Sequence, residues 1–261
     1  MRSLSVAATG MLAQQLNVEV ISNNIANMNT TAYKRQRAEF QDLLYQNQRR
    51  VGSSSSDNGT VVPSGVQLGL GVKTASVYRI TEQGNLQTTG NTLDLALQGR
   101  GFFQVELPTG DTGYTRAGSL QLSAEGKIVT ADGYPVKGGG TIPKTAIDIT
   151  VNANGEVLVK EAGKIELTRV GQFELASFPN DAGLEARGDN LFVSTAASGE
   201  AVTGQAGKNG FATIQQGFLE TANVNTVCEI TNLITAQRAY EMNSKVIQAS
   251  DEMLGSLNQM R

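Results

Sequence analysis

Apolar residues recur every seven positions at the start of the chain. The first row consists of Leu4, Met11, Val18 and Ile25. A second row follows three residues later; it contains Ile21 and is interrupted by Gln14. This spacing places the apolar side chains on one stripe of a helix that packs lengthwise against another helix. We predict a helix over residues 4–26, which ends where asparagine and threonine cluster at 27–31.

The far end of the chain carries a broader apolar pattern. Its main row, again spaced by seven, is Leu233, Tyr240, Ile247 and Leu254. The row one position earlier includes Val246 and Met253. Neighbouring helical positions differ by about 100°, so the two rows form a wide face. The pattern predicts a second helix, and its extra row needs another partner to cover it. The main row alone suits the core of a monomeric helical hairpin as well as a polymer interface.

The centre of the chain reads as β-structure. Short apolar runs at 102–105, 127–130 and 147–151 have the length of strands, and the dipeptides at 132–133 and 154–155 favour tight turns. No long helix alternates with these runs, which argues against a parallel doubly wound sheet. We expect an α+β fold: paired terminal helices in a coiled-coil-like layer (residues 1–30 and 224–261), a connecting segment (31–76) and a central antiparallel all-β domain (77–223).

The connecting segment mixes charge and polarity. Lys34, Arg35 and Arg37 are offset by Glu39 and Asp42, a mixture that is typical of a solvated helix face.

Residues 46–63, with serines at 53–56, cannot bury apolar surface, so we predict an extended polar loop there. Gly65, Gly69 and Gly71 lack the strand, helix and lysine of a phosphate-binding loop.

Composition removes common routes to catalysis. The chain of 261 residues contains no His, so the usual general base and the commonest metal ligand are missing. The single Cys, Cys228, sits among apolar residues, and we expect it to be buried and unreactive. The net charge of −3 gives no excess of positive charge that would indicate binding to nucleic acid. We predict no catalytic residue, metal or cofactor, and the residues show neither a membrane span nor a cleavable signal peptide.

Four separated motifs resemble the signatures of the flagellar rod and hook protein family. They lie, in the family's order, at 22–35, at 93–103, at 114–119 with 132–136, and at 217–224 with 236–245. Ala32 and Tyr33 stand where Gly-Phe is more usual, and Thr92 stands where Pro is common. The signature residues are Asn23, Asn24, Ala26, Asn27, Lys34, Leu93, Asp94, Gly99, Gly101, Phe102, Phe103, Gln237, Arg238 and Tyr240.

The resemblance implies a structural subunit of the distal rod, because the chain has no room for the extra outer domain of hook proteins and carries a loop insertion at 46–63. Such a subunit polymerises with itself into a helical tube that transmits torque across the periplasm. The implied partners are proximal rod proteins, the hook protein, the outer ring proteins and the flagellar type III export apparatus. The resemblance also implies export without cleavage of a signal peptide. A proximal rod subunit is the alternative within the family.

A different class remains open from the residues alone. An exported β-rich glycan hydrolase would use two carboxylates, for which Asp94 and Asp132 are candidates, but no spacing motif supports the pair. A carboxylate at a capped turn or a strand end is the simpler interpretation of Asp94.

The resemblance and the second apolar row favour a polymer interface over a monomeric hairpin. We predict that this interface comprises Leu4, Met11, Val18, Ile21, Ile25, Leu233, Tyr240, Val246, Ile247, Met253 and Leu254. Long helices with an uncovered apolar face are marginal in water. We therefore hypothesise that both termini are largely disordered in the free monomer, and that residues 46–63 form an arm across a neighbouring subunit.

Overall fold

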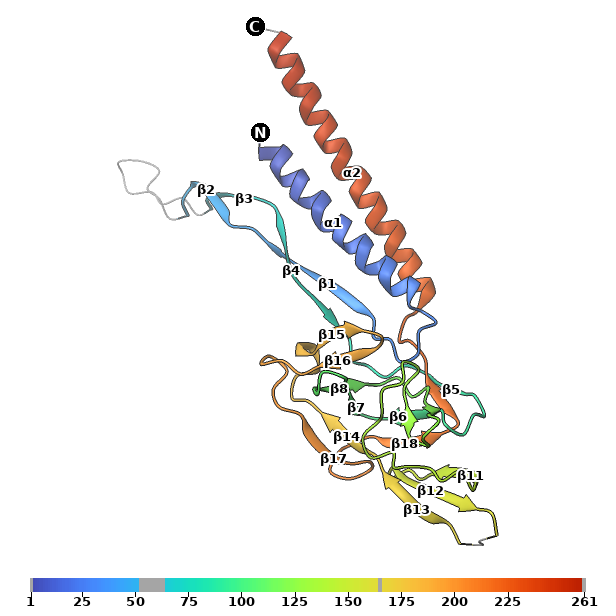
Figure 1. Cartoon of the computed structure of the whole chain (residues 1–261). Coiled ribbons are helices and arrows are strands. Elements are labelled where there is room, and N and C mark those ends of the chain that lie inside the picture. The colour runs from blue at the N-terminus through green and yellow to red at the C-terminus, as the bar shows by residue number, and fades with distance from the viewer. Residues whose placement is uncertain (1, 52–63, 164–165, 260–261) are drawn as a thin grey trace. The chain divides into compact units, whose positions relative to one another are not determined.

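The computed structural model describes residues 2–51, 64–163 and 166–259 (Figure 1). These residues form two compact units. The helical unit is made from residues 2–26, 36–51, 64–78 and 225–259, and the β unit from residues 27–35, 79–163 and 166–224. Two long helices and many antiparallel strands in separate sheets confirm the predicted α+β class.

Both predicted helices are present in the helical unit. Helix α1 spans Arg2–Ala26 and helix α2 spans Thr226–Gln259. Asn225 caps the start of α2, because its Oδ1 accepts hydrogen bonds from the backbone N–H groups of Val227 and Cys228 at 3.1 and 3.2 Å. The two helices lie side by side and contact each other (Figure 1). No helix in the described ranges is long and apolar enough to cross a bilayer.

The contact between the helices contains polar side chains. Asn24 donates to Glu229 at 3.4 Å near one end of the pair, and Ser250 donates to Ser3 at 3.3 Å near the other. Between them, a Cβ added at Gly10 would lie 2.9 Å from the side-chain amide nitrogen of Asn243, so the backbone of α1 approaches α2 closely there. Polar and small residues at such positions favour one register of the pair over its alternatives.

The strands of the helical unit form two hydrogen-bonded pairs. Strand β1 (Gln36–Asp42) pairs with β4 (Val72–Arg79), and β2 (Tyr45–Arg49) pairs antiparallel with β3 (Val66–Gly69). The sequence placed residues 31–76 in a connecting segment, whereas 36–51 and 64–78 cluster with the helices and 31–35 with the β unit. Most of the loop predicted at 46–63 lies outside the described residues, although 46–49 belong to β2.

Two local expectations for this part of the chain were wrong. Residues 36–42 form strand β1 rather than a solvated helix face, and Lys34 is buried at 6% exposure. Cys228 is exposed on α2 instead of being buried, and its apolar neighbours Val227 and Ile230 are 72% and 49% exposed as well. Apolar neighbours in sequence therefore did not indicate burial here.

The largest sheet of the β unit has six strands in the order β15-β16-β8-β7-β14-β17. Every neighbouring pair in it is antiparallel. Its strands are β7 (Phe102–Glu106), β8 (Thr112–Thr115), β14 (Glu174–Ser177), β15 (Glu185–Gly188), β16 (Leu191–Val193) and β17 (Val202–Gln205). A short 3₁₀-helix, η1 (Asp181–Gly183), precedes β15.

Smaller sheets complete the β unit. One has three strands in the order β11-β12-β13, and the others are the pairs β9 with β10, β6 with β18 and β5 with β19. Their bounds are β5 (Leu86–Thr88), β6 (Leu95–Gln98), β9 (Gln121–Leu122), β10 (Ile128–Val129), β11 (Ala146–Val151), β12 (Glu156–Glu161), β13 (Thr168–Gln172), β18 (Thr213–Gln216) and β19 (Phe218–Glu220). The predicted strands at 102–105, 127–130 and 147–151 correspond to β7, β10 and β11.

The pleat of β7 divides the apolar core of the β unit. Successive side chains of a strand point to opposite faces. Phe103 therefore joins a cluster in which its ring lies 5.9 Å from that of Phe173, whereas Phe102 joins a second cluster with Tyr114 and Phe178. The turn predicted at 132–133 closes between Thr130 and Tyr134, and the one at 154–155 joins β11 to β12.

Candidate functional site: a buried ion cluster in the β unit

A single carboxylate, that of Glu220 at the end of β19, binds two cations inside the β unit. Its Oε1 accepts a hydrogen bond from the Nζ of Lys34 at 2.6 Å, and its Oε2 accepts one from the Nε of Arg116 at 2.6 Å. The backbone N–H of Gly84 donates to Oε1 at 2.8 Å. The side chains of Lys34, Arg116 and Glu220 are 6%, 6% and 1% exposed, so the three form a buried ion cluster.

Backbone hydrogen bonds place Lys34 and Glu220 together. The N–H of Ala32 donates to the carbonyl oxygen of Glu220 at 2.8 Å, and the Nζ of Lys34 also donates to the carbonyl of Glu82 at 2.8 Å. Asn223 extends this network, because its Oδ1 accepts from the N–H of Arg35 at 2.7 Å and its amide nitrogen donates to the carbonyl of Glu82 at 3.0 Å. Three chain segments, at 32–35, 80–84 and 220–223, are thus joined within the β unit.

Arg116 connects the cluster to the turn between β6 and β7. Its Nη2 donates to the carbonyl of Gly99 at 2.7 Å and, more weakly, to that of Leu97 at 3.4 Å, and its Nη1 donates to Gly101 at 3.1 Å. Gly99 and Gly101 have φ angles of +114° and +147°, which glycine adopts without the steric cost that a Cβ imposes. The two signature glycines therefore present their carbonyls to one guanidinium.

Burial and charge oppose each other at Glu220. Burial alone favours the neutral carboxyl group, but the positive charges of Arg116 and Lys34, with their hydrogen bonds, outweigh it and hold the pKa of Glu220 below its usual value. Burial, followed by repulsion from Arg116, lowers the pKa of Lys34, and Glu220 offsets only part of this effect. The cluster thus holds one negative and two positive groups away from water.

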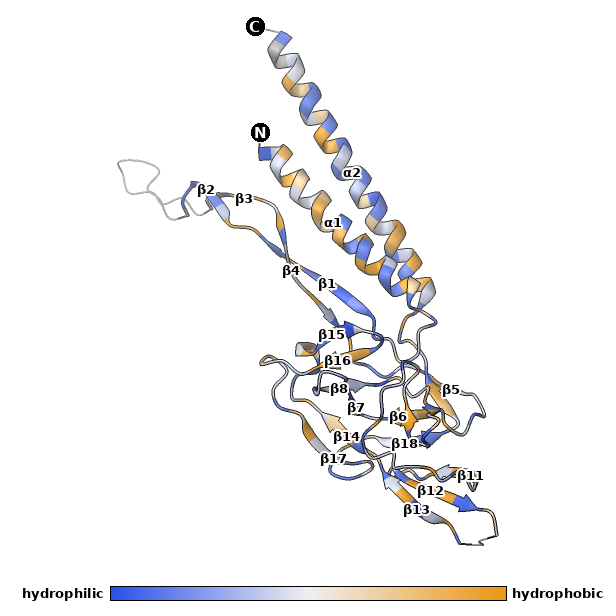
Figure 2. Ribbon diagram, viewed as in Figure 1, coloured by the Kyte–Doolittle hydropathy of each residue, from blue (hydrophilic) through white to orange (hydrophobic). Residues whose placement is uncertain are grey.

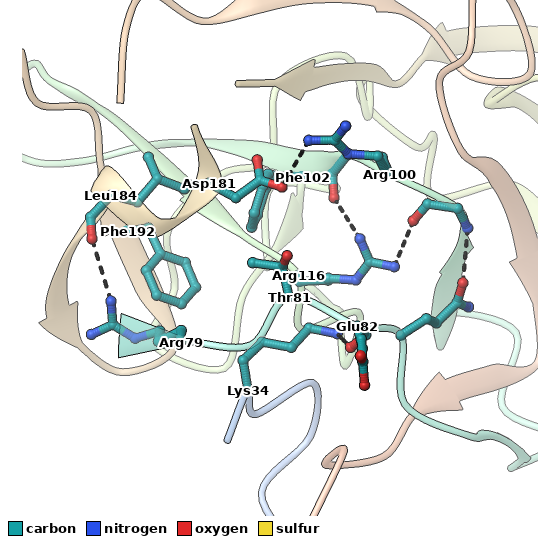
Figure 3. A pocket seen from close by; sticks show the side chains of 13 residues that line it. Lys34, Arg79, Thr81, Glu82, Arg100, Phe102, Arg116, Asp181, Leu184 and Phe192 are labelled. Carbon is teal, nitrogen blue, oxygen red and sulfur yellow. Dashed lines mark hydrogen bonds and ion pairs between the residues drawn. The ribbon is translucent and has the colours of Figure 1, made fainter. Parts of the chain in front are cut away.

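A cavity of about 320 Å³ opens beside the cluster (Figure 3). Lys34 and Arg116 line part of it, and Arg79 and Phe192 line another part, with the Arg79 guanidinium 5.3 Å from the centre of the Phe192 ring. Arg100 also lines the cavity and pairs with Asp181 of η1 at 3.2 Å. The described residues contain no group of three or more His, Cys, Asp or Glu side chains that could hold a metal ion.

The signature residues lie in several different environments. Lys34 belongs to the ion cluster, Gly99 and Gly101 bind Arg116, Phe102 lines the cavity, and Phe103 lies in the core.

Leu93 and Asp94 occupy a nearby turn, in which the Asn91 side chain donates to Asp94 at 3.0 Å. Asp94 is 8% exposed, whereas Asp132 lies in an exposed turn. The hydrogen bond from Asn91, and the position of Asp94 directly before β6, fit the interpretation of a carboxylate at a capped turn or a strand end.

The remaining signature residues belong to the helices or follow α1. Asn24 is buried and exchanges two hydrogen bonds with the backbone of Gln36, at 2.8 and 2.9 Å, which fixes the chain after α1. Asn23, Ala26, Gln237 and Arg238 are exposed, and Asn27 is half-buried.

The predicted interface residues differ in exposure within the helical unit. Ile21 is buried, whereas Tyr240, Val246 and Met253 are 43%, 47% and 59% exposed. The others are half-buried: Leu4, Met11, Val18, Ile25, Leu233, Ile247 and Leu254. Whether this set contacts other subunits stays a prediction.

Sequence reasoning did not single out Arg116, Glu220 or Asn223, although all three lie in quoted motifs. It also missed Arg79 entirely. A charged residue set among apolar ones, such as Glu220 after Phe218 and Leu219, was the available signal. That signal marks burial of a charge but does not identify its partner, which for Lys34 and Glu220 is 186 residues away.

Three family models match separate parts of the chain. The model described as "Flagella basal body rod protein" matches residues 4–34, and "Flagellar hook protein FlgE/F/G D1 domain" matches residues 96–159. The model described as "Flagellar basal body rod FlgEFG protein C-terminal" matches residues 215–260. The matched parts include both helices and much of the β unit.

Curated relatives match over the whole chain. The flagellar basal-body rod protein FlgG of Caulobacter vibrioides is 58% identical over 261 residues, which is 100% of both chains. FlgG of Borreliella burgdorferi is 45% identical over 100% of this chain and 99% of its own. The flagellar hook-basal body complex protein FlhP of Bacillus subtilis is 32% identical over 100% of both. The chain therefore belongs to the flagellar basal-body rod protein family and is a relative of FlgG.

Proposed function

We propose that this protein is a structural subunit of the flagellar distal rod, which assembles with copies of itself into a helical tube and transmits torque from the motor to the hook. It performs no catalysis in this role. Full-length similarity to proteins named as basal-body rod proteins supports the location, and the exposed apolar surface of α2 supports self-assembly.

The exposed apolar surface is the observation that carries the proposal. Apolar side chains of α2 are exposed along most of its length. Figure 2 shows by colour that apolar residues recur along this helix. They are Val227, Ile230, Ile234, Tyr240, Met242, Val246 and Met253. Extensive exposed apolar surface marks interaction sites in soluble proteins. In the proposed tube, the two helices form a coiled-coil-like inner layer and neighbouring subunits cover these side chains.

The buried ion cluster has a mechanical role in this proposal. The chain passes between the two units after residues 26, 35, 78 and 224. Lys34 lies next to the crossing after 35, Glu82 lies near the one after 78, and Glu220 and Asn223 lie near the one after 224. Hydrogen bonds join these three segments to one another. Force that enters the β unit through any one of these segments is therefore shared among them, which suits a subunit under torque.

The proposed partners follow from the position of a distal rod. They are the proximal rod proteins, the hook protein, the outer ring proteins and the flagellar type III export apparatus, which delivers the chain across the inner membrane without signal cleavage. A proximal rod subunit is less well supported, because relatives named FlgG match this chain at 58% and 45% identity.

Electron microscopy of concentrated purified protein tests self-assembly directly. We expect straight tubes from the natural chain and none from a variant in which Val227 and Met242 are both replaced by Gln. A matched control carries Gln at the exposed β-unit positions Leu122 and Val202, which leaves α2 intact. Tubes from the α2 variant would overturn the proposed interface.

Amide exchange on the dilute monomer tests the hypothesis that the ends fold on assembly. We expect fast exchange throughout α1 and α2 and slow exchange in β7 and β14. Equal protection of the helices and the β unit would contradict this hypothesis without affecting the assignment to the rod.

A further inference from the structure

We propose that the cavity beside Arg79 is a binding site for a carboxylate group. The Arg79 side chain comes from the last residue of β4 and reaches the cavity next to Phe192 of β16 (Figure 3). This site is separate from the apolar surface of α2, and it does not depend on the rod assignment.

Arg79 is a partly buried cation without an acidic partner. Its Nη1 donates to the carbonyl of Leu184 at 3.3 Å, and its guanidinium lies against the Phe192 ring at 5.3 Å. In the described part of the chain, no carboxylate lies within ion-pair distance of it. Burial lowers the pKa of Arg79, with a smaller opposite effect of Tyr33. Because a guanidinium has five N–H donors and stays protonated, donors remain available for a ligand.

The other cations of the cavity are already paired. Lys34 and Arg116 share the carboxylate of Glu220, and Arg100 pairs with Asp181. The Glu82 side chain also lines the cavity and adds a negative charge nearby. A single available guanidinium among these acids suits a singly charged anion better than a dianion such as phosphate.

Shape favours a carboxylate among singly charged anions. The planar fork of a guanidinium matches the two oxygens of a carboxylate in a bidentate pair. The cavity of about 320 Å³ is at the small end of ligand pockets, which range over about 300–1,000 Å³. It therefore accepts the end of an acidic side chain or a small carboxylic acid. Either source presents the same group to Arg79.

Binding is measured on the dissolved, ¹⁵N-labelled full chain by NMR. Sodium acetate is titrated and compared with sodium chloride and sodium phosphate at equal ionic strength. We expect acetate alone to shift the Arg79 Nε–H signal and the amide of Phe192 saturably, with an apparent Kd on the order of millimolar, because so small a ligand has little total binding energy. Identical shifts with acetate and chloride would overturn the proposal.

Variants assign the effect to Arg79. Arg79→Gln should weaken acetate binding by roughly tenfold or more, as expected for loss of a hydrogen-bonded charge partner, and Arg79→Lys should bind with intermediate affinity. Arg169→Gln is the matched control, since Arg169 is an exposed residue of β13 that does not line the cavity. Circular dichroism verifies that each variant is folded. Unchanged acetate binding by folded Arg79→Gln would also overturn the proposal.

The source of the carboxylate is found by comparing dissolved and assembled protein. If a neighbouring molecule supplies an acidic side chain, the Arg79 signal in assembled tubes is shifted without acetate. If the source is a free carboxylic acid, the shift appears in tubes only after acetate is added. Both results support a carboxylate site. Failure to form tubes would count against the proposed rod function alone, because the titration uses the dissolved chain.

Discussion

The two units of this protein bury their apolar residues to very different extents. In the β unit, Phe103 and Phe173 are fully buried, and the cluster around them draws on most of the sheets. In the helical unit, Leu12 and Met242 are both 67% exposed, although they belong to long, regular helices. The β unit thus completes its own core, whereas the helices leave apolar surface uncovered.

This difference distinguishes a unit with a closed core from a unit that leaves apolar surface uncovered. A closed core contributes stability to a single molecule, because each buried apolar side chain gains about 1.5–3 kcal/mol over an exposed one. An exposed apolar helix face gains this only when a partner covers it. We therefore expect substitutions in the β unit to change the stability of the monomer, and substitutions on α2 to change assembly.

Breaking the ion cluster should have the largest effect on the β unit. Glu220→Ala leaves two buried cations without their counter-charge, and we expect about 3–5 kcal/mol of destabilisation. Urea unfolding followed by near-ultraviolet circular dichroism measures this. The matched control is Glu39→Ala, which removes an exposed carboxylate of the helical unit that pairs with Arg37. Equal midpoints for the natural chain and Glu220→Ala would show that the cluster does not stabilise the fold.

Acid should weaken the same cluster. The pKa of Glu220 is lowered in the folded protein, so the stability it contributes is complete above its unfolded pKa, about 4.3, and is lost as pH falls through the lower folded value. We expect the unfolding free energy of the natural chain to fall more steeply below about pH 4.3 than that of Glu220→Gln. Parallel pH profiles of the two proteins would contradict this expectation.

Replacing Gln104 should stabilise the β unit. Gln104 on β7 is 4% exposed, and its side-chain amide nitrogen has no hydrogen-bond partner among the described residues. An unpaired buried polar group costs about 1–3 kcal/mol, so Gln104→Met, of similar shape, should raise the unfolding free energy by about that amount. Gln121→Met, at an exposed position of β9, is the control and should have little effect. A lower midpoint for Gln104→Met would mean that the amide is satisfied in solution.

A smaller gain is expected at Ala32. Ala32 has a φ of +56°, in the left-handed region that favours glycine. Relief of about 1–2 kcal/mol of strain is partly offset by loss of a buried methyl group worth about 0.8 kcal/mol, so Ala32→Gly should stabilise by about 0.5 kcal/mol. Ala176→Gly in strand β14 loses a buried methyl without this relief, and thermal unfolding should show the opposite sign for it.

The smallest effect on the monomer is expected on α2. Val246→Thr with Met253→Gln removes apolar surface that is already exposed, so unfolding should change by less than about 0.5 kcal/mol. The critical concentration for assembly, measured by sedimentation, should rise at least about tenfold, because two side chains no longer gain from burial. Unchanged assembly would remove these two residues from the predicted interface.

Sequence patterns predicted the helices and hairpins better than they predicted which residues are buried. The heptads located both helices, and turn dipeptides such as Asn154-Gly155 located hairpins, because these signals act over a few residues. Burial depends on residues far apart in the chain, which is why Lys34 was assigned to a solvated face and Cys228 to a core.

The motifs resembling those of the rod and hook family were themselves visible in the sequence, but their physical meaning was not. Lys34, Gly99 and Arg116 are separated along the chain, and the structure brings them to one carboxylate and one turn. Arg79 lies outside every motif, and only the folded structure shows that it lines the cavity.

The sequence by itself determined the helices, the β-rich centre and the family, because periodicity, turn chemistry and ordered motifs are local properties of the chain. Only the tertiary structure decided which charges are buried and what each of them binds. The physical reason is that a charge is tolerated away from water only beside a partner, and the partner of Lys34, which is 186 residues away in sequence, becomes its neighbour only when the chain folds.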